Sequence, residues 1–205
     1  MPLAHLENAK IVKISQRREL AELFGLETRN KYEIQDENGV VIGFAAEQGK
    51  SLLAHFARHF FGHWRRFDIF VFDNERRQVL RSTHPFRFFF QRMEIFDSQD
   101  KQVGSVQQRF ALFHKRFDLE DDRGNVLMEV KSPIWKFWTF PVTKNGREVA
   151  FIRKKWSGAI HELMFDKDNF VVEFPTPLAL RERTLLLVAA LFVDLQYFEK
   201  KANRE

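Results

Sequence analysis

Short stretches in which apolar and polar residues alternate recur along the chain, separated by turns rich in Asp, Asn and Gly. The alternation is clear in KYEIQ (31–35), RMEIF (92–96), RFDLE (116–120) and FVVEF (170–174). A period of two is typical of a strand with one buried face. Turn signals begin at Asp36, Asp73, Asp97, Asp121, Lys144 and Asp166, about 22 to 24 residues apart from Asp73 onward. The pattern predicts six β-hairpins and therefore twelve strands.

The most apolar stretch of the chain lies near its C-terminus, where Leu185–Val193 contains no polar residue. Arg181, Glu182 and Arg183 precede it and Asp194 follows it. A membrane-spanning helix needs about 20 apolar residues, whereas a shorter helix that is apolar all round is typically buried in protein. We therefore favour a core helix over a membrane span, with the following residues in the core: Leu185, Leu186, Leu187, Val188, Leu191 and Phe192.

A closed barrel gives the half-apolar strands a core to cover and leaves no exposed sheet edge. The predicted fold is mainly β: a twelve-stranded antiparallel closed barrel around a buried C-terminal helix at about 178–200. The stretch SQRRELAELFGLET also predicts a short helix that starts with Ser15 as N-cap and stops at Gly25. We expect residues 1–24 to form an N-terminal extension with this helix, and residues 25–205 to form one barrel domain.

Composition narrows the range of functions. The chain has 24 Phe but no Cys, which excludes disulfides, thiolate metal sites and S-acylation. Its net charge of +5 favours an anionic partner, although interleaved charges also fit a plain solvated surface. The N-terminus has no apolar core of signal-peptide length, so we expect a cytoplasmic protein. No catalytic motif is present, and we do not expect an enzyme.

Five segments resemble the phospholipid scramblase family in order and spacing: ETRNKYEIQDENG, AAEQ, RRFDIFVFDNERRQVLRSTHPFRF, KKWSGAIHELMFDKDNFVVEFP and LLLVAALFVDLQYFEKK. The most specific motifs are Trp-Ser-Gly, the Asp-x-Asp-Asn-Phe turn and Phe-Pro before the helix. The resemblance implies a Tubby-like barrel closed around a C-terminal helix. It also implies calcium-stimulated movement of phospholipids between leaflets, and binding to membranes, proteins and, in some members, DNA.

The resemblance places a calcium site in the loop from Asp166 to Pro177. Asp166 and Asp168 match the family's first two carboxylates, but Pro177 and Ala179 stand where the family has Asp. Calcium takes six to eight oxygen ligands, and these two carboxylates with Glu173 make at best a weak site. The alternative, which we favour, is that Asp166 and Asp168 shape a hairpin turn. No other cofactor is expected.

Where the family carries cysteine clusters linked to acylation, this chain carries aromatic residues. Hairpin connectivity places these segments between repeats, at the barrel end opposite the Asp73, Asp97 and Asp121 turns. One interpretation is that the rings plug the barrel end. The other is a membrane-contacting rim. The aromatic candidates are Phe60, Phe61, Trp64, Phe88, Phe89, Phe90, Trp135, Phe137 and Trp138. The candidate basic neighbours are Arg65, Arg66, Arg87, Arg92 and Lys136.

These observations lead to two functional hypotheses. The first is a scramblase-related protein, peripheral on the inner face of a membrane, whose partner is a phospholipid or an anionic membrane surface and whose activity extends to moving phospholipids between leaflets. The second is a soluble module on the same fold that binds a protein or, with less support, nucleic acid, without lipid transport.

Overall fold

The computed structural model describes residues 4–17, 28–49, 67–85, 89–136, 138–155 and 169–197. These residues contain one short 3₁₀ helix, twelve strands and one long helix. In chain order these are η1 (Ala4–Glu7), β1 (Ile11–Gln16), β2 (Thr28–Gln35), β3 (Val41–Gly49), β4 (Phe67–Asp73), β5 (Gln78–His84), β6 (Arg92–Asp97), β7 (Gln102–Arg109), β8 (His114–Asp121), β9 (Val126–Pro133), β10 (Thr139–Lys144), β11 (Arg147–Lys155), β12 (Asn169–Glu173) and α2 (Leu180–Tyr197).

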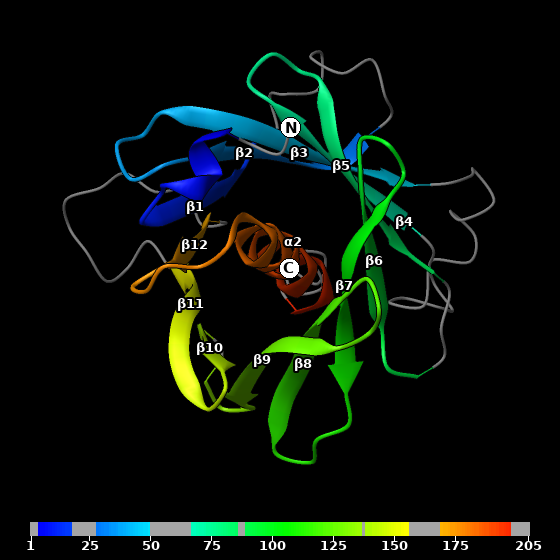
Figure 1. The fold of residues 1–205 in the computed structure, drawn as a ribbon, viewed down its shortest axis with the longest axis vertical. Helices are drawn as coiled ribbons and strands as arrows, with labels where there is room; N and C mark the ends of the chain where they lie inside the picture. Colours follow the sequence, from blue (N-terminus) through cyan, green and yellow to red (C-terminus); the bar gives the residue numbers. More distant parts are fainter. Residues whose placement is uncertain are drawn as a thin grey trace, which may run out of the picture.

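The strands form one closed antiparallel barrel around α2, which confirms the predicted architecture (Figure 1). From β2 to β12, each strand pairs with the next strand in the sequence. Strand β1 closes the barrel because it pairs with β2 on one side and with β12 on the other. Each of the twelve described strands therefore has two neighbours, and none of them forms an open sheet edge.

Four hairpin turns share one arrangement, which explains the repeated Asp of the sequence. In each turn the Asp Oδ1 accepts N–H groups from the residues two and four positions further on, at 2.8 to 3.0 Å. The residue three positions on has a positive φ. The four Asp residues are Asp36, Asp73, Asp97 and Asp121, and the positive-φ residues are Gly39, Arg76, Asp100 and Gly124. Such turns match the right-handed twist of paired strands.

One of these turns carries an acid-sensitive contact. The side-chain amide of Asn125 donates to Asp121, and this hydrogen bond, with the N–H groups of Asn125 and Arg123, lowers the pKa of the Asp121 carboxyl. The turn therefore contributes stability above the unfolded pKa of about 3.9, and loses it as the pH falls through the lower folded value. We expect Asn125→Ala to raise the pKa of Asp121, as measured by NMR titration of its carboxyl carbon. Asn38→Ala, on another hairpin, should leave that pKa unchanged, and an equal effect of both variants would contradict the assignment.

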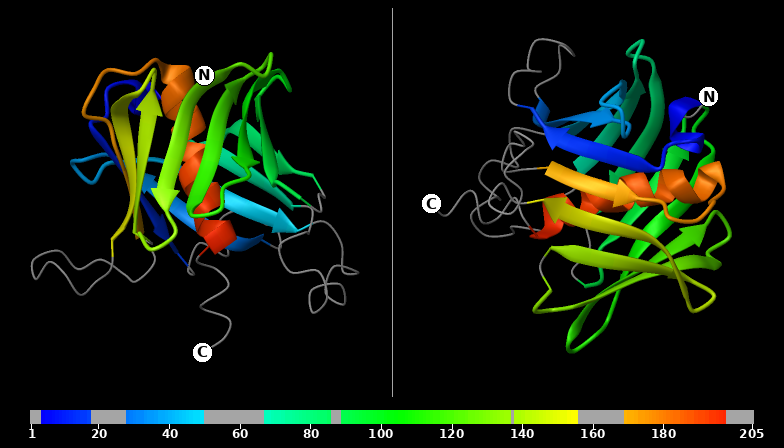
Figure 2. Two further views of the ribbon diagram at one scale, coloured as in Figure 1. Left: turned by 90° about the horizontal axis from the view of Figure 1, so that it is seen from below. Right: turned by 90° about the vertical axis from the view of Figure 1, so that its left-hand side faces the viewer.

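The core helix is buried over the whole predicted stretch, since no residue from Leu185 to Val193 is more than 1% exposed. Figure 2 shows α2 running through the barrel from one end to the other. Strand β7 approaches it closely at Gly104, where a Cβ atom would lie 3.0 Å from the Leu185 side chain and 2.3 Å from the Glu120 carbonyl oxygen. Within the described ranges, no helix combines the length and the apolar character needed to cross a bilayer.

Polar contacts at both ends of α2 hold the helix in place. At its start, the buried Arg183 donates to the carbonyl oxygens of Leu6 and Ala9, at 3.1 and 2.5 Å. At its other end, the Tyr32 hydroxyl donates to the Asp194 carboxylate at 2.8 Å. The charges that flank the apolar stretch therefore have partners inside the fold, and this satisfies the requirement that buried polar groups be hydrogen-bonded.

The N-terminal part of the chain differs from the sequence-based expectation. Ser15 is not the N-cap of a helix but a buried residue of β1, opposite Glu33 and Asn169. The barrel therefore begins before residue 25, and the 3₁₀ helix η1 precedes its first strand. Residues 18–27 and 156–168, including the predicted Asp166 turn, lie outside the described residues. The described barrel consists of five hairpins, from β2 to β11, closed by β12 and β1.

Candidate functional site: an exposed aromatic end of the barrel

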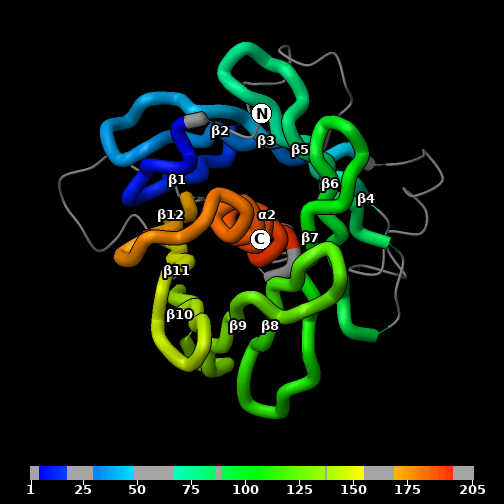
Figure 3. The backbone as a smooth tube through the Cα atoms, viewed as in Figure 1, coloured from blue at the N-terminus to red at the C-terminus, as the bar shows by residue number. Residues whose placement is uncertain are grey.

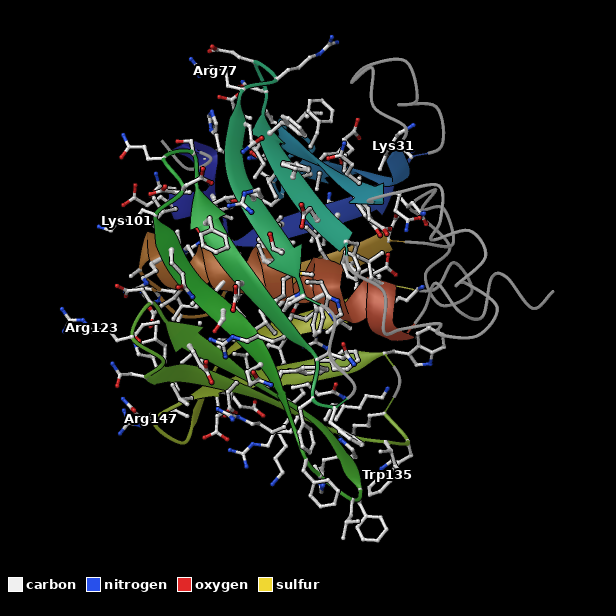
Figure 4. All side chains as sticks on the ribbon, turned by 90° about the vertical axis from the view of Figure 1, so that its right-hand side faces the viewer. Lys31, Arg77, Lys101, Arg123, Trp135 and Arg147 are labelled. Atoms are coloured by element: carbon white, nitrogen blue, oxygen red, sulfur yellow. The ribbon has the colours of Figure 1, made fainter. Side chains whose placement is uncertain are left out.

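The aromatic segments and the Asp turns lie at opposite ends of the barrel, as hairpin connectivity predicts. Figure 3 follows the backbone around the barrel from strand to strand. Because neighbouring strands run antiparallel, the chain returns to the same end after every second strand, which places the β5–β6 and β9–β10 connections at one end. In Figure 4, Trp135 lies at the opposite end from Lys101, Arg123 and Arg147, which mark three of the hairpin turns. The prediction is confirmed for the segments around Phe89 and Trp135, and that around Phe60 lies outside the described residues.

Large apolar side chains protrude from three consecutive connections at this end. Phe89 is 80% exposed, Trp135 is 64% exposed, and neither plugs the barrel. The β7–β8 connection, which the sequence analysis did not single out, contributes three more exposed side chains. We call the following set the aromatic end: Phe89 and Phe90 from β5–β6, Phe110, Leu112 and Phe113 from β7–β8, and Ile134, Trp135 and Trp138 from β9–β10.

The three connections are linked to one another. The rings of Phe90 and Phe110 meet edge to face with centroids 6.3 Å apart, which joins the first connection to the second. The N–H of Ile134 donates to the carbonyl oxygen of Phe113 at 3.1 Å, which joins the second to the third. The rings of His114 and Trp135 lie 6.5 Å apart. The three connections that carry the exposed side chains are therefore joined to one another, as a contiguous contact site requires.

Two of the three connections of the aromatic end carry basic residues and no carboxylate. Stretches 109–117 and 130–138 contain no Asp or Glu, but do contain Lys115, Lys131 and Lys136, of which the last two are exposed. At the opposite end, carboxylates outnumber basic side chains in the five hairpin turns. The carboxylates there are Asp36, Glu37, Asp73, Glu75, Asp97, Asp100, Asp121 and Asp122, and the basic residues are Arg76, Arg77, Lys101, Arg123, Lys144 and Arg147.

Of the predicted basic neighbours, the structure describes Lys136 and Arg92, and they differ. Lys136 is exposed beside Trp135. The Arg92 side chain is only 18% exposed, and its guanidinium donates to Glu120 Oε2 at 2.8 Å and to Gln107 Oε1 at 3.0 Å. Arg92 is thus a structural residue beneath the surface and presents no free charge there, which corrects its assignment to the basic rim.

Several predicted site residues cannot be placed. The following lie outside the described residues: Phe60, Phe61, Trp64, Phe88, Phe137, Arg65, Arg66, Arg87, Asp166 and Asp168. The β7–β8 connection could have been found in the sequence, because FALF (110–113) stands between two predicted strands and no carboxylate lies nearby. The same connectivity that places Phe89 and Trp135 at this end also places FALF there.

The structure describes one of the three calcium candidates. Glu173 lies at the end of β12 farther from Asp168, and its carboxylate pairs with Arg153 at 3.2 Å. Among the described residues, no three His, Cys, Asp or Glu side chains gather in a way that could hold a metal ion. Glu173 therefore acts in the described structure as an ion-pair partner on the barrel surface.

The aromatic end carries protruding side chains, whereas the opposite end of the barrel contains a cavity. A cavity of about 510 Å³ lies there beside the first turn of α2, between the β6–β7 and β8–β9 turns. Arg181 forms part of its wall, with its guanidinium bonded to the Val103 carbonyl oxygen and to Asp122. The described residues of the two ends thus differ in shape, in charge and in the number of exposed aromatic side chains.

A twelve-stranded antiparallel barrel closed around a C-terminal helix is the Tubby-like fold. The X-ray structure of a protein from Arabidopsis thaliana shares this fold, with a TM-score of 0.50 at 13% identity, over 95% of this chain and 96% of that chain. The sequence model of the Scramblase family matches residues 1–200, and the chain belongs to the scramblase family.

Relatives from animals and yeast agree with this assignment. The chain is 29% identical to phospholipid scramblase 1 of Rattus norvegicus, over 99% of this chain and 64% of the relative. It is 30% identical to phospholipid scramblase 2 of Bos taurus, over 96% and 71%. It is 23% identical to a phospholipid scramblase family protein of Schizosaccharomyces pombe, over 97% and 62%. The chain thus spans less than two thirds of the length of the rat and fission-yeast relatives.

Proposed function

We propose that this scramblase-family protein binds phospholipid membranes through the aromatic end, as a peripheral protein on the cytoplasmic face. The observation that carries the proposal is the exposure of aromatic side chains on three linked connections, with lysines and no carboxylate in the described stretches 109–117 and 130–136. Aromatic side chains with basic neighbours suit the interface of an anionic bilayer. In this proposal the rings provide the attachment that acylated cysteines would otherwise provide.

The expected energies support reversible attachment. Burial of apolar surface contributes roughly 25 cal/mol per Å², so a few partly inserted rings contribute several kcal/mol. Each basic residue near an anionic surface adds about 1 kcal/mol, as Lys131 and Lys136 would. Attachment of this strength is strong enough to concentrate the protein on a membrane and weak enough to be released.

Movement of phospholipid between leaflets is the activity that this binding would serve, because binding to the bilayer is its first requirement. The proposal assigns no chemical step to the chain. It also assigns calcium no essential role at the aromatic end, since Glu173 is paired with Arg153 and the lysines can contact anionic headgroups directly.

Co-sedimentation of the protein with vesicles tests the proposal. We expect binding to vesicles of phosphatidylcholine with phosphatidylserine, and weaker binding to phosphatidylcholine alone. Binding should fall as salt is added but should not vanish, because salt screens the lysines and not the inserted rings. Calcium chelation should leave it unchanged. If the protein binds neither type of vesicle, the proposal fails, and self-association through the aromatic end would then indicate a protein-binding surface.

A further inference from the structure

The β5–β6 connection carries an unusual backbone conformation. Phe90 has a φ of 51°, in the left-handed region that a bulky residue rarely adopts. Its side chain is 45% exposed, and that of Phe89 beside it is 80% exposed. Since the Phe89 ring is mostly in solvent and the Phe90 ring is nearly half exposed, burial in the core does not explain why the backbone keeps this conformation. Such a strained residue persists only where its surroundings determine it.

The side chain of Gln107, on β7, provides these surroundings. It is 6% exposed, and its amide nitrogen donates to the carbonyl oxygen of Phe90 at 3.1 Å. The same nitrogen contacts the carbonyl oxygens of Gln91 at 3.4 Å and Gln108 at 2.9 Å. One buried amide thus joins the end of β7 to the residue with the left-handed backbone.

The orientation of this amide is itself fixed. Arg92 donates to the amide oxygen of Gln107, so that the nitrogen faces the Phe90 carbonyl oxygen. The guanidinium of Arg92 is held in turn by Glu120, which also accepts hydrogen bonds from Ser105 at 3.0 Å and from Arg109 at 2.6 Å. An arginine has only donors, so the contact with Arg92 permits one orientation of the amide.

We propose that Gln107 is the positioning residue of the aromatic end: it holds Phe90 in the left-handed conformation and so presents Phe89 and Phe90 to lipid as a preformed wedge. This inference rests on the proposed membrane binding and deepens it. A loop already held in its bound conformation avoids the entropy lost in ordering on contact, and therefore binds more tightly than the same rings on a loose loop.

A double-mutant cycle tests this role, with partitioning to vesicles of phosphatidylcholine and phosphatidylserine as the readout. The variants are Gln107→Met, the double variant Phe89→Ser with Phe90→Ser, and their combination. Gln102→Met, at the other end of β7, is the matched control. All measurements are made well below the thermal midpoint of every variant, so that only folded protein is compared.

We expect Gln107→Met to weaken partitioning about tenfold, because the two rings must then be ordered on contact with the membrane, at a cost in entropy. Gln102→Met should have no effect. Without the two rings, Gln107→Met should weaken partitioning no further. Two results would overturn this inference alone, provided that the wild type partitions. In the first, Gln107→Met binds as well as Gln102→Met. In the second, Gln107→Met lowers affinity as much in the Phe89→Ser, Phe90→Ser background as in the wild type. If the wild type does not partition, membrane binding fails and this inference fails with it.

Discussion

Leu187→Asp should leave no folded barrel at room temperature. Leu187 lies in the middle of α2, is 1% exposed and belongs to the apolar core of the barrel. A buried unpaired carboxylate together with the lost leucine should cost more than about 5 kcal/mol. That is comparable with the whole stability of a typical domain, which is about 5 to 15 kcal/mol. Loss of the far-UV β signal and of a cooperative thermal transition would be the measured result.

Two further variants make this result specific to the core. Leu187→Ala should still fold, but with a free energy of unfolding lower by about 2 to 5 kcal/mol. Leu112→Asp places the same charge on a side chain that is 73% exposed, and should change stability by less than about 0.5 kcal/mol. A Leu187→Asp protein with a wild-type melting curve would show that α2 is not the core of the barrel.

Replacing Phe89 and Trp135 together by Ser should weaken vesicle binding about a hundredfold. The two rings come from different connections of the aromatic end, and partial insertion of both is worth about 3 kcal/mol at roughly 25 cal/mol per Å². The thermal midpoint should change little, because both side chains are mostly exposed. The measurements are vesicle partitioning and a thermal melt of the same samples.

The matched control removes apolar surface from the other end of the barrel. Val40 and Val126 are 51% and 46% exposed on the β2–β3 turn and at the start of β9, and their replacement by Ser should leave vesicle binding unchanged. If the Phe89 and Trp135 variant melts far below the wild type, the rings are packed as part of the core, and their role in membrane contact must be abandoned. Equal losses of binding in both double variants would show that attachment is not specific to one end.

Much of the fold could be read from the sequence because it depends on local interactions. Each Asp of the repeated turns bonds to N–H groups no more than four residues away, so spacing alone predicts the hairpins. The burial of α2 follows from its composition and length, since an apolar stretch too short to span a bilayer needs a protein core. Because consecutive strands run antiparallel, the connections between hairpins lie at the end of the barrel opposite the hairpin turns. Phe89 and Trp135 belong to such connections and are therefore placed at that end.

The candidate site was predicted less completely. Connectivity gives the end of the barrel at which a ring lies, but not whether the ring points into the barrel or into solvent. The exposure of Phe89, and the contribution of Phe113 from a connection that had not been considered, became clear only in the folded structure. The position of Arg92 in the sequence predicted a basic residue on the surface. In the structure its guanidinium pairs with Glu120, 28 positions away in the chain, and lies beneath the surface.

The sequence by itself determined the hairpins, the core helix and the placement of the turns and the aromatic connections at opposite ends of the barrel, because short-range spacing and local composition set all three. The tertiary structure alone decided how the barrel closes, which charges remain free and how Phe90 is held. Strand β1 pairs with β12, roughly 160 residues away, and Gln107 reaches Phe90 across 17 positions. Contacts between such distant residues leave no periodic signal along the chain, since they exist only when the barrel brings the strands together.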